Sequence, residues 1–308
     1  MNRRKFLKQS LFATGGLLLI PPFFSKQLEL KAAPNRLKPT PNDWRDDELN
    51  ITWIGHSTVL INFYGKIILT DPVLFDRVGI QILGMTYGPS RASAPALYID
   101  EIPKPDLILL SHAHMDHMDM KTLSTFTNKY PNQIDCITAF NTSDVIEELE
   151  WKSIHEMDWK DEFQIHGINF NAIEVQHFGW RLPWERDRSK GYFSNGRSFN
   201  AYVLEKNGKK ILFGGDTAMT DKFKNSGVQV DIAIMPIGAY NPWRKNHCNP
   251  EEALQMASEV NAKIFIPIHA NTFKQGLEPI DEPLRWMIDS HSNYNLAIGI
   301  EEIGGTFT

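Results

Sequence analysis

The sequence has few cysteines, no long apolar run and no excess of basic residues, and each shortage excludes a class of protein. Its 308 residues include only two cysteines, Cys136 and Cys248, which excludes a disulfide-stapled scaffold, although two cysteines can still pair in an oxidising compartment. The formal net charge is −5. Binding to nucleic acid rests largely on Lys and Arg contacts with phosphate, so we expect no nucleic-acid partner. Hydrophobic residues make up 42% of the chain, which is enough for a sizeable core.

The start of the chain differs in charge from the rest. Of the 32 basic and 37 acidic residues, the first 33 positions hold six and one, which leaves 26 and 36 elsewhere, a balance of −10. Arg3 and Arg4 precede an apolar stretch at 11–24 that is interrupted by Pro21 and Pro22 and is short for a membrane span of about 20 residues. This pattern resembles a twin-arginine export signal, with an ordinary buried N-terminal helix as the alternative.

We therefore predict three parts along the chain: a twin-arginine-type signal segment at 1–33, a proline-bearing linker at 34–47 and one globular domain at 48–308. The protein is expected to be periplasmic or otherwise exported. Ala32 and Ala33 form the best small-residue cleavage site, but a leucine and a lysine precede them where small residues are preferred. Cleavage therefore stays open, and an uncleaved segment would anchor the protein to the membrane.

One short stretch carries most of the chemistry. His112, His114, Asp116 and His117 fall within six residues, directly after the apolar run at 107–110. That run predicts a buried strand, so the four side chains are expected at its carboxyl end, where α/β sheets commonly bind ligands. Neutral imidazole and carboxylate are ligands suited to zinc or iron. The alternative is a polar loop with surface histidines, but a cluster this dense after a buried strand favours a metal site.

Three more candidate ligands follow apolar strands further along the chain: His177, Asp216 and His269. Asp216 comes directly after two glycines, which let the backbone approach a bound ion closely. Any one of these residues alone is more often a core or loop residue than a ligand. Together with the first cluster, they supply the ligands that a two-metal site requires.

The rest of the chain predicts alternating strands and helices, with no internal repeat and no low-complexity tract. An irregular, partly apolar region is expected at 73–98. The predicted strands lie at 51–54, 59–63, 67–70, 134–139, 167–175, 199–205, 210–213, 231–235, 263–267 and 296–300. The predicted helices lie at 119–129, 143–150, 249–260 and 282–290. The third of these helices has the best-defined start, because Asn249 suits the N-cap and Pro250 the first turn.

The ordered ligands, spread over 51–270, resemble those of the metallo-β-lactamase fold superfamily. The resemblance implies an α/β fold, a four-layer αβ/βα sandwich with the metals at one edge. It also implies two divalent metal ions, zinc in the first place, with iron or manganese fitting similarly. The ligand set that it implies is His112, His114 and His177 for one ion, Asp116, His117 and His269 for the other, and Asp216 for both.

Six further segments look like the branch of this superfamily that contains N-acyl-phosphatidylethanolamine-hydrolysing phospholipase D. They are 53–58, 69–72, 88–91, 176–178, 236–240 and 247–253. The ascorbate-phosphate lactonase branch shares the first segment, whereas the Pro-Ile-Gly-Ala-Tyr run ending at Tyr240 favours the phospholipase. One departure follows His269, where Ala270 and Asn271 replace the Trp-Gly of the phospholipase pattern.

The resemblance implies an exported binuclear hydrolase of phosphodiesters, most plausibly phospholipid-like or small ones. A lactonase or another ester hydrolase is the alternative; a redox di-iron protein and a non-catalytic binding protein are further alternatives. Catalytic roles fall to Asp116, Asp216 and His247, the last beside the substrate phosphate or its leaving group. Arg181 and Tyr240, together with His247, are predicted to bind substrate.

Two other features remain open to more than one interpretation. His56 and Asp71 are predicted either to orient ligand imidazoles or to be ordinary buried turn residues. The apolar residues at 78–85 line an acyl-chain groove, contact lipid as a peripheral membrane element, or pack into the core. The residues predict no particular oligomeric state.

Overall fold

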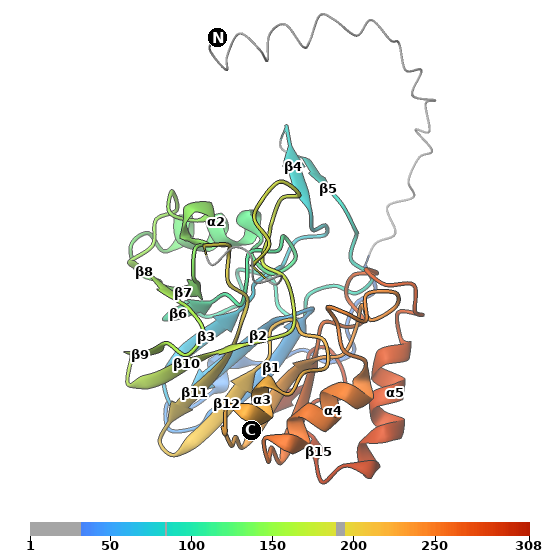
Figure 1. The fold of residues 1–308 in the computed structure, drawn as a ribbon. Coiled ribbons are helices and arrows are strands. Elements are labelled where there is room, and N and C mark those ends of the chain that lie inside the picture. Colours follow the sequence, from blue (N-terminus) through green and yellow to red (C-terminus); the bar gives the residue numbers. More distant parts are fainter. Residues whose placement is uncertain (1–31, 84, 189–194) are drawn as a thin grey trace, which may run out of the picture. The chain divides into compact units, whose positions relative to one another are not determined.

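The computed structural model describes residues 32–83, 85–188 and 195–308 (Figure 1). All of the predicted signal segment except its last two residues lies outside the described residues. The segment predicted as a linker contacts the domain at its start. Ala33 N donates to Ala92 O at 2.9 Å and Ala94 N donates to Ala33 O at 2.8 Å, while Asn35 Nδ2 donates to Ala94 O at 2.7 Å.

The first of two large sheets is built mainly from the N-terminal half of the domain. Its strands are, in order across the sheet, β16 (Thr306–Phe307), β1 (Leu49–Gly55), β2 (Thr58–Phe63), β3 (Ile67–Thr70), β6 (Leu107–Leu109), β7 (Asp135–Ala139) and β8 (Ser153–Met157). β1, β2 and β3 form an antiparallel meander, and β3, β6, β7 and β8 run parallel. All six residues of β2 are buried, because this sheet is covered on both faces.

The second sheet repeats this plan with the C-terminal half of the domain. Its strands are, in order, β15 (Ala297–Ile298), β14 (Ile264–Ile268), β13 (Ile232–Pro236), β12 (Lys209–Phe213), β11 (Asn200–Lys206), β10 (Ile168–Glu174) and β9 (Glu162–Ile165). β9 to β12 are antiparallel, and β12 to β15 are parallel. The two sheets meet in one hydrophobic cluster that includes fully buried aromatic residues from both, such as Trp53, Phe63, Tyr202 and Phe213.

Helices pack outside the sheets (Figure 1). They are α2 (Met120–Lys129), α3 (Lys222–Asn225), α4 (Pro250–Glu259) and α5 (Glu282–Ser290), with 3₁₀ turns η1 (Pro41–Asp43), η2 (Ser143–Val145) and η4 (His291–Asn293). α4 begins as predicted, with a capping box in which Asn249 and Glu252 each accept a backbone N–H of the other. The mixed α/β architecture with two large sheets confirms the predicted fold class.

Several predicted elements differ from the observed ones. The helix predicted at 143–150 is wrong, since only the turn η2 forms there. Glu156 Oε1 accepts from the N–H groups of Thr142 and Ser143 at 2.9 and 2.7 Å, which caps the start of this turn. Beyond it, Glu147 and Glu150 are like charges three residues apart, which opposes a longer helix. β8 and β9 were not predicted, because their half-exposed residues give only a weak apolar pattern.

The region predicted to be irregular at 73–98 contains a separate two-stranded hairpin of β4 (Ile80–Ile82) and β5 (Met85–Tyr87). Two glycines at its base let the strands approach closely. A Cβ on Gly79 would lie 2.1 Å from Tyr87 O, and one on Gly88 would lie 2.1 Å from Val78 O. Both have positive φ, +135° and +155°, so no other residue fits this base without a backbone shift.

Candidate metal centre

The candidate ligands lie at strand ends of both sheets. The loop after β6 brings His112, His114, Asp116 and His117, and the loops after β10, β12 and β14 bring one residue each. The apolar strands are buried while the polar residues that follow them face the same edge. All seven ligands predicted from the sequence therefore come together, in two groups of side chains that could each hold an ion.

The first group consists of His112, His114, His177 and Asp216. His114 Nδ1 lies 2.8 Å from His112 Nε2 and 3.2 Å from His177 Nε2. Asp216 Oδ2 lies 4.0 Å from His112 Nε2 and 3.9 Å from His177 Nε2. Donors bound to one zinc ion at about 2.0–2.1 Å are separated by a little over 3 Å in tetrahedral geometry, so these four atoms are spaced for a single small ion.

The second group consists of Asp116, His117 and His269, with His56 beside them. His117 Nε2 and His269 Nε2 lie 3.5 and 3.4 Å from Asp116 Oδ2. The same two nitrogens lie 3.1 and 3.2 Å from Asp216 Oδ2. One oxygen of Asp216 therefore faces both groups, which is the arrangement of a carboxylate that bridges two ions.

The donor atoms fit metal ions in chemistry as well as in spacing. His117 Nε2, His269 Nε2 and Asp216 Oδ1 are buried, and none has a hydrogen-bond partner within the part of the chain that the structure describes. A buried polar atom without a partner is costly, and a bound cation would satisfy it. Histidine and carboxylate donors suit zinc, iron or manganese.

Hydrogen bonds orient the ligands of the first sheet through side chains. His117 Nδ1 donates to Asp71 Oδ2 at 2.7 Å. Ser111 Oγ donates to the same carboxylate at 2.6 Å and accepts from His112 Nδ1 at 2.8 Å. Asp71, which lies after β3, thus fixes which nitrogen of each imidazole faces the ion. The predicted orienting role of Asp71 matches these contacts.

A ligand of the second sheet is held by the main chain instead. His177 Nδ1 donates to the carbonyl of Asn246 at 2.9 Å. Nε2 of His177 is then left to face the first group. Because the partner is a backbone oxygen, the side chain at 246 plays no part in this bond.

Three carboxylates, Asp71, Asp116 and Asp216, set the electrostatics of the site. Burial lowers the pKa of His117, but Asp216, Asp116 and Asp71 outweigh it and raise that pKa well above its usual value. Burial also lowers the pKa of His269, but Asp216 and Asp116 outweigh it and raise that pKa to about 9. The same carboxylates that raise these two pKa values also attract a metal cation, which would displace the proton from each imidazole on binding.

The other imidazoles are kept neutral by their surroundings. Burial lowers the pKa of His56 to about 3 and of His114 and His247 to about 4, and the pKa values of His112 and His177 fall well below the usual range for the same first reason. Neutral imidazole is the form that ligates metal, which suits the first group.

The predicted substrate residues lie around this centre in different ways. His247 Nδ1 is 3.8 Å from Asp216 Oδ2, and His247 forms a further donor group with Asp216 and His269. Arg181 Nη1 donates to the carbonyls of Ala113 and Met118 at 2.6 and 3.1 Å, so its guanidinium holds the ligand loop. No described contact tests its binding to substrate.

Tyr240 is buried and contacts two residues of α5. Its hydroxyl donates to Glu282 Oε1 at 2.5 Å, and its ring packs edge-on against Trp286 with the centroids 5.7 Å apart. The substrate role predicted for Tyr240 stays a prediction.

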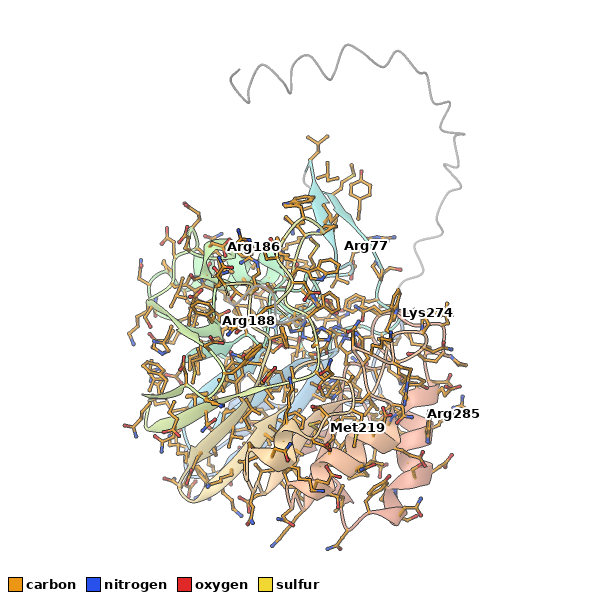
Figure 2. All side chains as sticks on the ribbon, viewed as in Figure 1. Arg77, Arg186, Arg188, Met219, Lys274 and Arg285 are labelled. Carbon is orange, nitrogen blue, oxygen red and sulfur yellow. The ribbon has the colours of Figure 1, made fainter. Side chains whose placement is uncertain are left out.

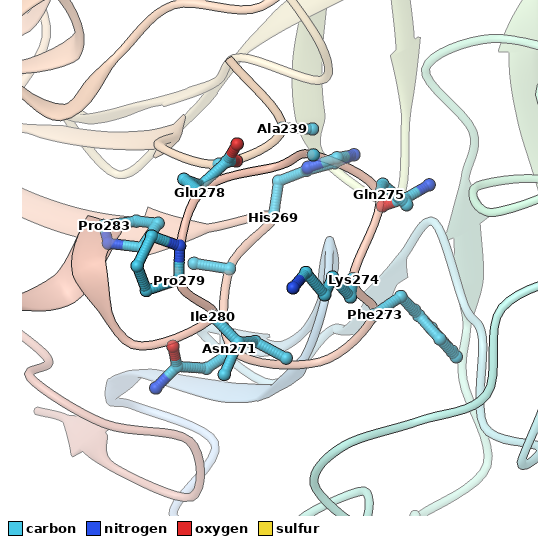
Figure 3. A pocket seen from close by; sticks show the side chains of 13 residues that line it. Ala239, His269, Asn271, Phe273, Lys274, Gln275, Glu278, Pro279, Ile280 and Pro283 are labelled. Carbon is cyan, nitrogen blue, oxygen red and sulfur yellow. The ribbon is translucent and has the colours of Figure 1, made fainter. Parts of the chain in front are cut away.

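Two contributions were missed by sequence reasoning. His56 was predicted either to orient ligands or to be an ordinary buried turn residue, but its Nε2 lies 3.0 Å from Asp116 Oδ2 and within the second donor group. Gln275 Nε2 donates to the same oxygen at 2.7 Å. Gln275 lines a small pocket next to His269, closed on its other side by Glu278 and Pro279 (Figure 3). No sequence signal marks Gln275, because the departure from the phospholipase pattern after His269 lies at Ala270 and Asn271.

Comparison with known proteins agrees with this geometry. The model of the β-lactamase superfamily domain matches residues 66–270. The chain is 30% identical over 281 residues to N-acyl-phosphatidylethanolamine-hydrolyzing phospholipase D 1 of Caenorhabditis elegans, which covers 82% of this chain and 74% of that protein. It is 26% identical over 233 residues to a metal-dependent hydrolase of Exiguobacterium, covering 73% and 87%. Among solved structures, isothiocyanate hydrolase from Delia radicum gut bacteria aligns with a TM-score of 0.64 at 18% identity, covering 84% and 98%.

The chain belongs to the metallo-β-lactamase superfamily and is a metal-dependent hydrolase. Within the superfamily it falls in the branch of N-acyl-phosphatidylethanolamine-hydrolysing phospholipase D, as the sequence predicts.

Proposed function

We propose that this protein uses two metal ions to hydrolyse phosphodiesters, and that its substrates are phospholipid-like. The observation that carries the proposal is Asp216, whose Oδ2 lies within 3.1–4.0 Å of imidazole nitrogens in both donor groups. A carboxylate shared in this way favours two ions working on one substrate group. The relative from Caenorhabditis elegans, named for hydrolysis of N-acyl-phosphatidylethanolamine, supports the phosphodiester.

The residues of this chain would divide the work as follows. His112, His114 and His177 would hold one ion, and Asp116, His117 and His269 the other, with Asp216 between them. When bound, two divalent ions polarise a phosphoryl oxygen and lower the pKa of water to about 7. The chain contributes the rigid frame, because each imidazole that Asp71, Ser111 or a backbone carbonyl orients can present only one nitrogen to the site.

The metal ions are proposed to be zinc, since the site offers histidine and carboxylate and no cysteine. Mass spectrometry of the purified protein should find close to two ions per chain. Removing them with a chelator should abolish hydrolysis, and adding zinc should restore it, with iron and manganese as parallel additions. Full activity in the metal-depleted protein would contradict the proposal.

The substrate class is tested by a panel that separates the two candidate reactions. A phospholipid phosphodiester, bis(p-nitrophenyl) phosphate and a sugar lactone would each be offered to the zinc-loaded enzyme. We expect cleavage of both phosphodiesters. Cleavage of the lactone alone would instead support the alternative, a lactonase of the ascorbate-phosphate type.

We also propose that the protein is exported through the twin-arginine route and contacts membranes peripherally. The paired Arg3 and Arg4 ahead of a moderately apolar stretch motivate the first part. Replacing both with lysine should leave folded protein in the cytoplasm when cells are fractionated. Unchanged export would show that the two arginines are not the signal.

A further inference from the structure

We infer that the β4–β5 hairpin docks the enzyme on the surface of a phospholipid bilayer. The inference names the surface that makes the peripheral membrane contact proposed above, and its link to turnover rests on the proposed hydrolysis. None of the helices among the described residues is long and apolar enough to span a bilayer, so a membrane contact of this part of the chain would be made at the surface.

The hairpin has one apolar face and one polar face. Its register pairs Ile80 with Tyr87 and Ile82 with Met85, while Gln81 pairs with Thr86. Directly opposed residues share a face and successive residues alternate, so the four large apolar side chains all lie on one side. They are 51–55% exposed, and Leu83 at the turn is 93% exposed. These residues are therefore neither core nor the lining of a closed groove.

This exposed patch stands apart from the rest of the molecule. The hairpin rises from the main body, and its side chains splay outward at the tip, with Arg77 at the base (Figures 1 and 2). Monomeric proteins seldom expose contiguous apolar side chains in this way without a partner for them. The close approach of the two strands at Gly79 and Gly88 holds them together as a single hairpin.

The charges around the patch favour a bilayer. No Asp or Glu occurs from residue 77 to residue 99, although the domain as a whole is acidic. A carboxylate would be costly to bring near a lipid surface, because desolvation penalises it and anionic headgroups repel it. The hairpin carries no acid, so it can approach a lipid surface without that cost.

The size of the patch argues against a second protein as its partner. Five side chains of this kind offer on the order of 500 Å² in total, whereas each partner in a stable protein interface contributes roughly 800 Å². Insertion into the headgroup layer needs no complementary surface, and its strength grows with the apolar area that is buried.

The hairpin is also connected to the metal centre by direct packing. Val78 at its base is buried against Phe273. The Phe273 ring lies edge-on to His56, with 5.3 Å between centroids, and His56 Nε2 lies 3.0 Å from Asp116 Oδ2. The base of the hairpin is thus linked to His56 of the second donor group through one buried side chain, Phe273.

The test places a fluorescent label at the tip. Cys136 and Cys248 are free and buried, so an environment-sensitive thiol dye would react with a cysteine introduced by Leu83→Cys. On addition of phosphatidylcholine vesicles, with and without phosphatidylglycerol, the dye should brighten several-fold and shift to the blue. Asp221→Cys, at an exposed position outside the hairpin, is the matched control and should change little. An unchanged tip signal in protein that sediments with vesicles would overturn the inference.

A second measurement separates docking from catalysis. The double variant Ile82→Ser, Leu83→Ser should bind vesicles at least about 10-fold more weakly, whereas Gln81→Ser with Thr86→Ser, on the polar face, should bind like the wild type. Both should hydrolyse bis(p-nitrophenyl) phosphate at the wild-type rate. Loss of a dimer in the apolar-face variant during sedimentation velocity would assign the patch to a second copy instead. Vesicle binding without any phosphodiester cleavage would reject the proposed function and leave docking intact.

Discussion

The two sheets share a strand plan but supply the metal centre in different ways. The first sheet delivers four ligands within six residues, all from the single loop after β6. The second sheet delivers His177, Asp216 and His269 singly, from the ends of three strands. One loop can present a dense cluster by local turning, whereas the scattered ligands meet only because three alternate strands of the second sheet, β10, β12 and β14, end at the same edge. The first half of the site is therefore local, and the second half depends on the tertiary fold.

The hydrogen bonds that orient the ligands also differ between the two halves of the site. Side chains, Asp71 and Ser111, orient the imidazoles of the first sheet. The backbone carbonyl of Asn246 orients His177 in the second. Single substitutions should therefore damage the outer support of the first sheet but leave that of the second in place.

The largest effect is expected where the two halves join. Asp216→Ala removes the carboxylate that faces both donor groups, so it should release at least one ion. Phosphodiester hydrolysis should fall by more than roughly 100-fold, which is the most that loss of a hydrogen bond orienting a ligand usually costs. Metal analysis and initial rates measure this. Asp221→Ala, an exposed acid in the same connection between β12 and α3, is the control. Two ions retained in Asp216→Ala would mean that the halves hold metal independently.

The next effect sharpens the contrast between side-chain and main-chain support. Asp71→Asn replaces the carboxylate that accepts a hydrogen bond from His117 Nδ1 with a neutral amide. Metal affinity should therefore fall by about 10–100-fold in chelator competition. Asn246→Ala keeps its carbonyl, so affinity should stay at the wild-type value. Equal losses in the two variants would remove the distinction.

A smaller effect is expected at the contact that crosses between the halves. Gln275 comes from the loop after β14, yet it donates to Asp116 of the first cluster. Gln275→Ala should weaken metal binding by about 3- to 10-fold, the worth of one hydrogen bond to a partly accessible group. Lys274→Ala, next to it and exposed, should leave affinity unchanged. Matching losses in both variants would point to the loop rather than the hydrogen bond.

The smallest effect should appear only in stability. Asn249→Ala removes the cap of α4 and should lower the free energy of unfolding by about 1 kcal/mol, measured with urea on the metal-loaded protein. Gln255→Ala, on the exposed side of the same helix, is the comparison. Metal content should be unchanged in both. Loss of an ion in Asn249→Ala would show that the helices behind the second sheet hold its ligands in place.

The same contrast explains what the sequence could predict. The His-x-His-x-Asp-His cluster can be recognised from the sequence because its members are adjacent. The other ligands, His177, Asp216 and His269, can be recognised because each follows an apolar strand. Gln275 could not be found, since its partner Asp116 lies 159 residues away. The carbonyl of Asn246 carries no sequence signal, because every residue has one.

The errors in secondary structure have the same origin. At 143–150 the local pattern favours a helix, but only the turn η2 forms, and its start is held by two bonds to Glu156 from a later strand. The sequence shows apolar residues at 78–85 but not that they share one face of a hairpin. Ile80, Ile82, Met85 and Tyr87 come onto one side only through the pairing of β4 with β5, which composition alone does not specify.

The bridging position of Asp216 also sets an order in time. A ribosome adds roughly 5–20 residues per second, so the 152 positions between His117 and His269 take on the order of 10–30 s to synthesise. Throughout that interval the nascent chain carries the dense cluster without its partners. Neither donor group is complete until a strand of the second sheet has emerged and folded. Tight capture of both ions therefore comes late in folding, after the strands of the second sheet as far as β14 have formed.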